Sequence, residues 1–297
     1  MTRAWRAFTS RLLGVKAMSK LLSAECIRMM KNKLFWFAVA AMTICEIYCI
    51  QFGARVNKSA DDTLETYYFY LAPMVGIFFA VFISLFLGTE HSDSTIRNKM
   101  IVGHTREQIY LSYYLTCLLG SVIMEIGWFI GGLTGIPLLG SFTSDTKMLI
   151  LYFVSILLFT AALTALFVGI SLMMPNKAGS AVLQIILVLI LIFLSAEIYN
   201  GLCEPEEATK AFLSETGQLI MSDPEPNPRY IGGLLRTVYT WAVNISPMGQ
   251  GILILHQFAG DSGSVPYLPT LQILSSLMMT ALFLGVGIAV FRKKDLK

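Results

Sequence analysis

The sequence predicts an all-α polytopic membrane protein with six transmembrane helices, an N-terminal interfacial helix and an outer re-entrant segment before the last span. Three observations lead to this fold class. Of the 297 residues, 55% are hydrophobic and only 14% are charged, whereas about 25% charged residues are usual in a soluble domain. Six apolar stretches are each long enough to cross a hydrocarbon core, which takes about 20 helical residues. Positive charge is distributed unevenly between these stretches.

The N-terminal segment, residues 1–33, contains eight Lys or Arg and one acid, Glu25. The positive-inside rule therefore predicts that it stays in the cytoplasm. Five apolar residues in its second half share one side at helical spacing, which predicts an amphipathic helix along the membrane surface: Leu21, Leu22, Cys26, Met29 and Met30. The small-residue pattern of a cleaved signal peptide is missing. Translation from Met1 and from Met18 both fit the sequence.

The six predicted spans place both termini on the same side of the membrane. They are Leu34–Phe52, Tyr70–Gly88, Ile109–Leu133, Met148–Met174, Ala178–Ala196 and Leu268–Phe291. The N-terminal segment, the loop after the second span, Lys177 and the basic tail 292–297 together hold 16 Lys or Arg, and the opposite loops hold six. This asymmetry predicts that both termini are cytoplasmic.

Small residues recur at every fourth position in the third and fourth stretches. They are Gly127, Gly131 and Gly135 in one, and Ala161, Ala165 and Gly169 in the other. Such rows let helix backbones approach closely in lipid, although Gly is also frequent in membrane helices generally. The rows favour a position for both helices inside the bundle.

The segment 199–267 is predicted to form a cap on the outer side of the membrane. Pro205 and the acids after it are typical of a helix N-terminus, and the sequence DPEPNP at 223–228 ends that helix. Residues 245–258 are apolar but too short to span, which predicts a re-entrant or interfacial piece.

Several function classes are excluded by what the sequence lacks. The net charge of +3 is spread between apolar runs, so no basic face for nucleic acid is predicted. The five cysteines form no CxxC pair and have no His at ligand spacing, so neither a disulfide framework nor a metal site is expected. No GxxxxGKS or GxxxxGKT phosphate loop occurs, and the three histidines belong to no nucleophile motif. We expect no enzyme and no cofactor bound by this chain.

Two acids, Glu46 and Glu125, fall within predicted spans, where an ionisable group is a functional candidate. Glu46 is near the outer end of its span, so contact with Arg55 or with water explains it equally well. Glu125 is deeper, and it either lines a pathway or bonds to another helix.

The loop after the second span, residues 89–108, is the charged segment in the middle of the chain. Ser94 or Thr95 can cap a short helix that runs to Val102, and Gly103 can end it. Four apolar residues interrupt its charges: Ile96, Met100, Ile101 and Val102. Such a helix suits insertion into a groove of a partner protein. A solvated connector that anchors on the membrane explains the pattern equally well.

The segment TIRNKMIVGHTREQIYLSYY, residues 95–114, resembles the first cytoplasmic loop of type 2 ATP-binding cassette (ABC) exporter permeases. The matching positions are Glu90, Thr95, Ile96, Arg97, Asn98, Lys99, Gly103, Thr105, Arg106, Ile109, Tyr110, Leu111 and Ser112. Tyr113 stands where a lysine is common. The segments ISPMGQG at 245–251 and VFRKKDLK at 290–297 also resemble this family.

The resemblance implies a pair of permeases, identical or different, above separate ABC ATPase subunits that bind ATP and Mg. It implies that loop 89–108 is the coupling element, beside the N-terminal helix, and that the outer re-entrant pieces gate the exit. The residues implied in coupling are Glu90, Thr95, Ile96, Arg97, Asn98, Lys99, Gly103, Thr105 and Arg106.

The expected function is ATP-driven export of a hydrophobic or amphipathic compound across a bacterial plasma membrane. The nearest resemblance is to permeases of peptide or antibiotic efflux and of bacteriocin immunity, but family membership leaves the cargo open. One rival is an ion-gradient-driven secondary transporter, which would need inverted repeats and more buried ionisable groups. A second rival is a membrane scaffold that transports nothing.

Overall fold

The structure is a computed structural model that describes residues 18–56, 63–92, 95–174, 176–209, 211–213, 219–221, 223–258 and 265–294. Six helical stretches in this part are long and apolar enough to cross a membrane: Lys33–Val56, Leu64–Thr89, Arg106–Leu139, Thr146–Met173, Lys177–Cys203 and Pro269–Lys293. Each of them overlaps one of the six predicted spans. The protein is therefore an all-α polytopic membrane protein, as the sequence predicted.

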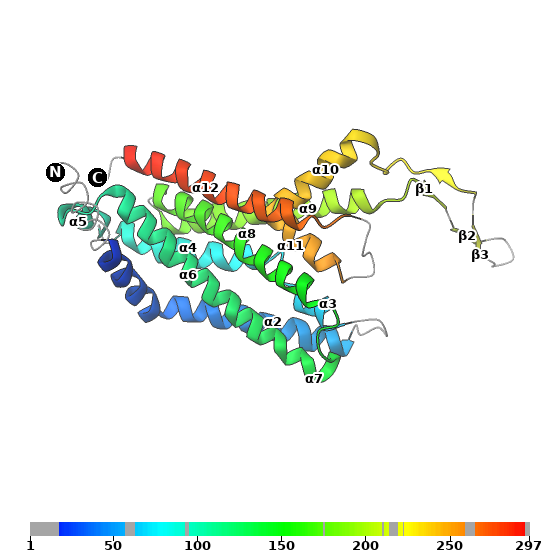
Figure 1. The fold of residues 1–297 in the computed structure, drawn as a ribbon, viewed down its shortest axis with the longest axis horizontal. Coiled ribbons are helices and arrows are strands. Elements are labelled where there is room, and N and C mark those ends of the chain that lie inside the picture. Colours follow the sequence, from blue (N-terminus) through cyan, green and yellow to red (C-terminus); the bar gives the residue numbers. More distant parts are fainter. Residues whose placement is uncertain are drawn as a thin grey trace, which may run out of the picture.

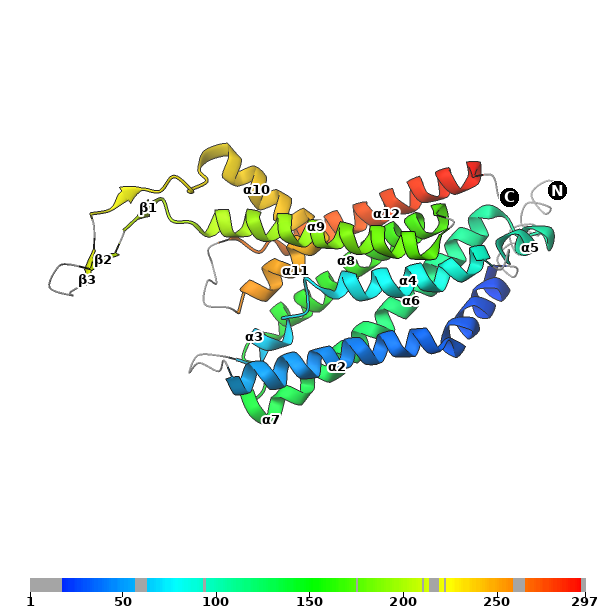
Figure 2. The ribbon, with the colours of Figure 1, turned by 180° about the vertical axis from the view of Figure 1, so that it is seen from behind.

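The N-terminal helix occupies residues 18–31 and meets α2 (Lys33–Val56) at Asn32. The side-chain Oδ1 of Asn32 accepts a hydrogen bond from the backbone N–H of Leu34 at 2.9 Å, which caps the start of α2. Figure 2 shows this dark-blue helix inclined to α2. Leu21 and Met29 are buried against the bundle, whereas Met30 is exposed. The predicted helix is present, and part of its apolar face packs on protein.

The second span is broken where the sequence contains Pro73. A short helix, α3 (Leu64–Tyr68), is followed by turns over residues 69–74 and then by α4 (Val75–Ser92). Proline has no N–H to donate and clashes with the preceding helical turn, so a helix does not continue through it. The break exposes backbone at 72–73 to a neighbouring element described below.

The glycine row of the third span packs against α2. This span consists of α6 (Arg106–Gly132), η1 (Leu133–Gly135) and α7 (Ile136–Leu139). A Cβ added at Gly127 would meet the Oγ1 of Thr43, and one added at Gly131 would lie 2.9 Å from the Thr43 carbonyl oxygen. Only glycine permits this approach of two helix backbones, so the predicted close packing of this row is confirmed.

The fourth and last spans, α8 (Thr146–Met173) and α12 (Pro269–Lys293), run side by side along most of their length. Figure 1 shows α12 in red above α8 in green. The fifth span, α9 (Lys177–Cys203), packs on α4. Ala165 and Gly169 of the α8 row are buried and face α12.

The outer segment forms paired strands where the sequence predicted a helix. The pairs are β1 (Glu207–Ala208) with β4 (Glu225–Pro226), and β2 (Ala211–Leu213) with β3 (Leu219–Met221). Figure 1 shows this arm extending beyond the bundle, where a helix would find no partner for its apolar side. The helix prediction was wrong because two short apolar runs separated by five residues that include Gly217 are a hairpin signal.

Two short helices follow the arm, α10 (Gly233–Ile245) and α11 (Pro247–His256). Ser246 caps α11, and its residues from Pro247 to Ile254 are buried. A Cβ added at Gly251 would lie 2.8 Å from the backbone of residues 72–73, at the break in the second span. The buried Gln250 donates to Ser275 Oγ at 3.3 Å and accepts from Ser276 Oγ at 3.1 Å, which joins α11 to α12. The glycine and glutamine residues of ISPMGQG therefore hold α11 inside the bundle.

Candidate functional site

The loop after the second span contains a short helix, α5 (Thr95–Ile101), with well-defined ends. Gly103 has φ of 100°, a left-handed conformation that favours glycine. Its N–H donates to the Met100 carbonyl at 3.0 Å, and the His104 N–H donates to the Lys99 carbonyl at 3.2 Å, which is a Schellman motif. The predicted C-terminal end is confirmed. Ser94 lies outside the described residues, as does its predicted capping role.

One face of α5 is anchored to the bundle and to the N-terminal helix. Ile96 is buried, and the Lys99 ammonium donates to Glu25 Oε1 at 2.5 Å and to the Tyr113 hydroxyl at 2.7 Å. Arg28 forms a second ion pair with Glu25 at 3.0 Å. Burial lowers the pKa of Lys99, and the hydrogen bond to Glu25 opposes that shift. The ion pair thus joins the helix 18–31, α5 and α6.

The opposite face of α5 is open to solvent. Arg97 and Asn98 are exposed, and Ile101 and Val102 have 74% and 78% of their surface accessible. Exposed apolar side chains next to a cation are typical of a docking surface. We call the four residues Arg97, Asn98, Ile101 and Val102 the α5 tip. A hollow of about 290 Å³ lies beside the tip, and its lining includes Leu21, Thr95 and His104.

The turn from α5 into α6 is fastened to the last span. Thr105 caps α6 through a capping box with Gln108. The Nη1 of Arg106 donates to three carbonyl oxygens at the end of α12: Phe291 at 3.1 Å, Arg292 at 2.8 Å and Lys294 at 2.5 Å. The Phe291 carbonyl also accepts from the Lys294 N–H at 3.4 Å. The last carbonyls of a helix lack the usual α-helical donor, so a cation there is stabilising.

A further contact continues this connection to the fourth span. The Lys294 ammonium donates to the carbonyl oxygens of Leu172 at 2.9 Å and Met173 at 3.1 Å, which end α8. Burial lowers the pKa of Lys294. Arg292 also forms an ion pair with Glu107. The ends of α6, α8 and α12 are therefore linked to one another, and Figure 1 places α5 at the same end of the bundle. We call this the terminal end.

The two membrane acids are both fully buried, on facing helices. Glu46 of α2 lies beside the Trp128 indole of α6, without a hydrogen bond of normal geometry among the described residues, and Arg55 instead donates to Gln51 at 3.1 Å. The interpretation that Arg55 or water contacts Glu46 was therefore wrong, because α6 packs closely on this part of α2 through its glycine row. Glu125 of α6 accepts a hydrogen bond from Thr160 of α8, so its predicted bond to another helix is confirmed.

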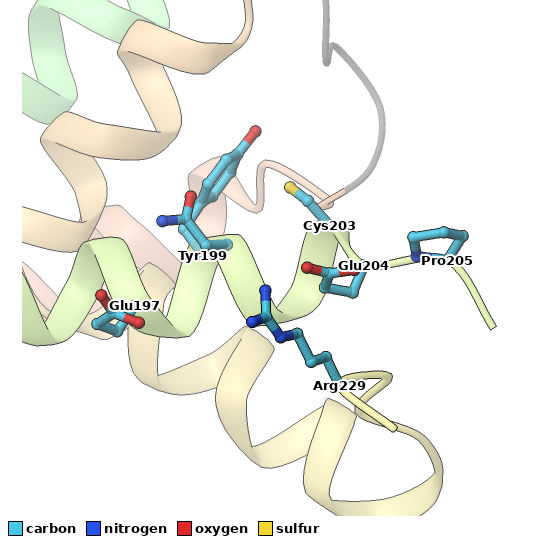
Figure 3. A pocket seen from close by; sticks show the side chains of 8 residues that line it. Glu197, Tyr199, Cys203, Glu204, Pro205 and Arg229 are labelled. Atoms are coloured by element: carbon cyan, nitrogen blue, oxygen red, sulfur yellow. The ribbon is translucent and has the colours of Figure 1, made fainter. Parts of the chain in front are cut away.

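At the opposite end of the bundle, a hollow of about 850 Å³ lies between the end of α9 and the chain that follows the arm. Figure 3 shows its side chains, with Glu197 and Glu204 from the α9 side and Arg229 from the other. Asn227 donates to Glu204 Oε2 at 2.9 Å, which holds the two sides together. The hollow is polar, in contrast to the hollows between the spans.

A sequence model described as "ABC-2 family transporter protein" matches residues 21–195. The match extends from the helix 18–31 through the α5 tip and into the fifth span, α9. The chain belongs to the ABC-2 transporter family. No curated protein matches the chain. Members of this family are membrane transport components that act with an ABC ATPase subunit, so this chain is an ABC permease and a multi-pass membrane protein.

Seven of the nine residues implied in coupling of this ABC-2 permease separate into three groups. Arg97 and Asn98 point outward, and Ile96 and Lys99 point into the bundle. Gly103, Thr105 and Arg106 shape and fasten the turn. Thr95 is half-buried, and Glu90 lies in the last turn of α4 with its side chain outside the described part. Sequence reasoning missed Glu25 and Lys294, although Glu25 is the one acid among eight basic residues of the N-terminal segment.

Proposed function

We propose that this permease couples to a separate ATPase subunit through the α5 tip and exports a hydrophobic or amphipathic compound. The terminal end then faces the cytoplasm of a bacterial cell, in agreement with the 16 Lys or Arg on the corresponding loops. A second permease, identical or related, completes the membrane part. The single observation that carries the proposal is the division of α5 into an anchored face and an open tip.

This division fits a coupling element because force can pass only through a segment that is fixed to the moving spans. Lys99 fixes α5 to the N-terminal helix and to α6. Arg106 and Lys294 then connect the following turn to α12 and α8. A push on Ile101 or Val102 would therefore act on three spans at once. A solvated connector would need none of these contacts.

We propose further that the two buried acids lie along the export pathway. Glu46 and Glu125 are on facing helices in the interior of the bundle, where an ionisable group is costly and is retained for a function. Cargo with hydrogen-bond donors would find acceptors there. Peptide or antibiotic efflux is the class that we favour.

The test compares Ile101→Asp with Leu234→Asp in full-length protein purified from membranes of the source organism. Both residues are exposed, with 74% and 81% of their surface accessible, but Leu234 lies on α10 at the opposite end. Burying an Ile side chain is worth about 1.5–3 kcal/mol, so Ile101→Asp should weaken retention of the ATPase by about 10- to 100-fold. Leu234→Asp should leave it unchanged. Equal ATPase retention by both variants would refute the role of the tip.

A further inference from the structure

The short helix α3 is separated from the rest of its span. Six residues in turns, 69–74, lie between α3 and α4, and Pro73 prevents the two helices from joining into one. Figure 2 shows α3 at the end of the bundle opposite to α5. We call this the outer end, because it faces outward in the proposed function. A break of this kind lets α3 change its orientation without disrupting a helix, as the hinges of moving domains do.

Glu65 attaches α3 to the loop between α7 and α8. Its Oε1 accepts hydrogen bonds from the backbone N–H groups of Thr143 at 2.7 Å and of Ser144 at 2.8 Å. Glu65 is fully buried. Burying a carboxylate is costly, and the best-attested role of a buried charged contact is to fix a register or to act as a switch. Because an apolar contact could hold α3 at lower cost, the charged contact favours an attachment that is made and broken.

Two hydroxyl groups complete the attachment of α3 to its neighbours. The Thr66 hydroxyl donates to the carbonyl oxygen of Phe258, just after α11, at 3.1 Å. The Tyr68 hydroxyl donates to the carbonyl oxygen of Phe129 in α6 at 2.9 Å. With the Glu65 contact, these bonds connect α3 to the loop before α8, to the end of α11 and to α6. Release of α3 would therefore free three elements of the outer end together.

The other end of the same span leads to the α5 tip. α4 is a continuous helix of 18 residues, about 27 Å long, and α5 begins after two further residues and packs against it. At its outer end, the break at 69–74 lies against α11, where a Cβ at Gly251 would be 2.8 Å from the backbone of residues 72–73. A displacement of α5 can therefore pass along α4 to the break, and from the break to α3.

We propose that α3 is a latch that holds the outer end of the permease closed, and that the Glu65 carboxylate locks it. Movement of α4 during the ATP cycle draws Glu65 away from Thr143 and Ser144, and the outer ends of α6, α8 and α11 then separate. The latch rests on the proposed coupling of the α5 tip to an ATPase. It lies outside the segment 199–267, from which a gate was expected.

Hydrogen–deuterium exchange measures the lock directly, because the amide protons of Thr143 and Ser144 are the ones that bond to Glu65. The experiment uses the full chain in nanodiscs with its copurified ATPase, and follows a peptide that spans residues 140–147 by mass spectrometry. Without nucleotide, these two amide protons should exchange slowly. During ATP hydrolysis their exchange should accelerate at least about tenfold, because the latch opens in each cycle.

Two variants separate the lock from the contacts around it. Glu65→Gln keeps the size of the side chain and removes its charge. Hydrogen bonds to a charged acceptor are about twice as strong as neutral ones, so both amide protons should exchange about tenfold faster even without nucleotide, and ATP should add little. Thr143→Val removes a hydroxyl that lies 3.3 Å from Glu65 Oε1 and keeps both backbone donors. It should exchange as the unaltered protein does.

The outcomes distinguish the latch from the proposed coupling. Slow exchange of both amide protons while the complex hydrolyses ATP would overturn the latch and leave the coupling intact. Exchange of Glu65→Gln at the rate of the unaltered protein would also overturn it. Ile101→Asp should keep the slow exchange and lose the acceleration by ATP, because the ATPase is released. Acceleration that persists in Ile101→Asp would refute the role of the tip and support the latch.

Discussion

The ion pair between Glu25 and Lys99 should hold the helix 18–31 against α5, and Glu25→Gln tests this with little change in shape. The Glu25 side chain is 4% exposed and the Lys99 side chain 18%. Removing one partner of a buried pair costs about 3–5 kcal/mol. Glutamine still offers an oxygen, and Lys99 keeps the Tyr113 hydroxyl. We therefore expect Glu25→Gln to weaken the docking of the helix 18–31 on the bundle by about 3 kcal/mol, the lower end of this range.

A native thiol reports this loss directly. Cys26 is half-buried on the same helix, with its Sγ 3.8 Å from Thr116 Oγ1. In a background with the other four cysteines replaced by alanine, the rate of maleimide labelling of Cys26 measures how often the helix leaves the bundle. A loss of about 3 kcal/mol raises the fraction of molecules in which the helix has left the bundle by about 100-fold. The labelling rate of Cys26 should rise by the same factor.

The control for this measurement is Glu206→Gln, which makes the same change at an exposed position beside the arm. It should leave Cys26 labelling unchanged. The variant Lys99→Met should accelerate labelling as well, and the double variant should be less affected than the sum of the two single changes. Labelling of Glu25→Gln at the rate of the unaltered protein would refute the reasoning.

Three further predictions concern packing, buried polar groups and pH. Gly251→Ala should lower the stability by about 1–3 kcal/mol through overpacking, seen as a lower Tm in detergent, whereas Gly285→Ala should not; an unchanged Tm for both would contradict the close approach. Thr160→Val should destabilise the protein by about 1–3 kcal/mol, because it leaves the buried Glu125 carboxyl without its donor. Glu125→Gln should destabilise it less. A lower Tm for Glu125→Gln than for Thr160→Val would contradict this prediction. Since the pKa of Lys99 is lowered in the folded protein, the unfolded chain binds more protons between the two pKa values, so stability should rise with pH there. This rise should be missing in Lys99→Met. If the Tm of Lys99→Met and of the unaltered protein changed equally with pH, the pH dependence would not come from Lys99.

Much of the fold was predictable because span length and charge asymmetry are local properties of the sequence. The C-terminal end of α5 was also predictable, since Gly103 acts on its immediate neighbours. The third span was predicted to begin at Ile109, whereas α6 begins at Arg106, where Thr105 caps it. The arm was predicted wrongly because the acids after Pro205 outweighed the hairpin signal of two short apolar runs. Without a partner for a helix, the pairing of adjacent runs was the more favourable arrangement.

The contacts of the candidate site could not be predicted, because they join residues far apart in the chain. Lys99 and Glu25 are separated by 74 positions, and Arg106 and Lys294 by 188. Charge patterning shows each ion but not its partner. The sequence left open whether Glu46 is a functional residue within the membrane or contacts Arg55 or water. Its burial follows from the approach of α6, which depends on the packing of Gly131 rather than on the sequence around Glu46.

The most direct test of the central claim is purification of the tagged chain from membranes of its source organism, followed by measurement of bound ATPase. We predict that a separate subunit with a Walker-type phosphate loop copurifies, that the complex hydrolyses ATP, and that Ile101→Asp removes both the subunit and the activity. Transport by this chain in proteoliposomes that hold no ATPase, driven by an ion gradient, would contradict the account.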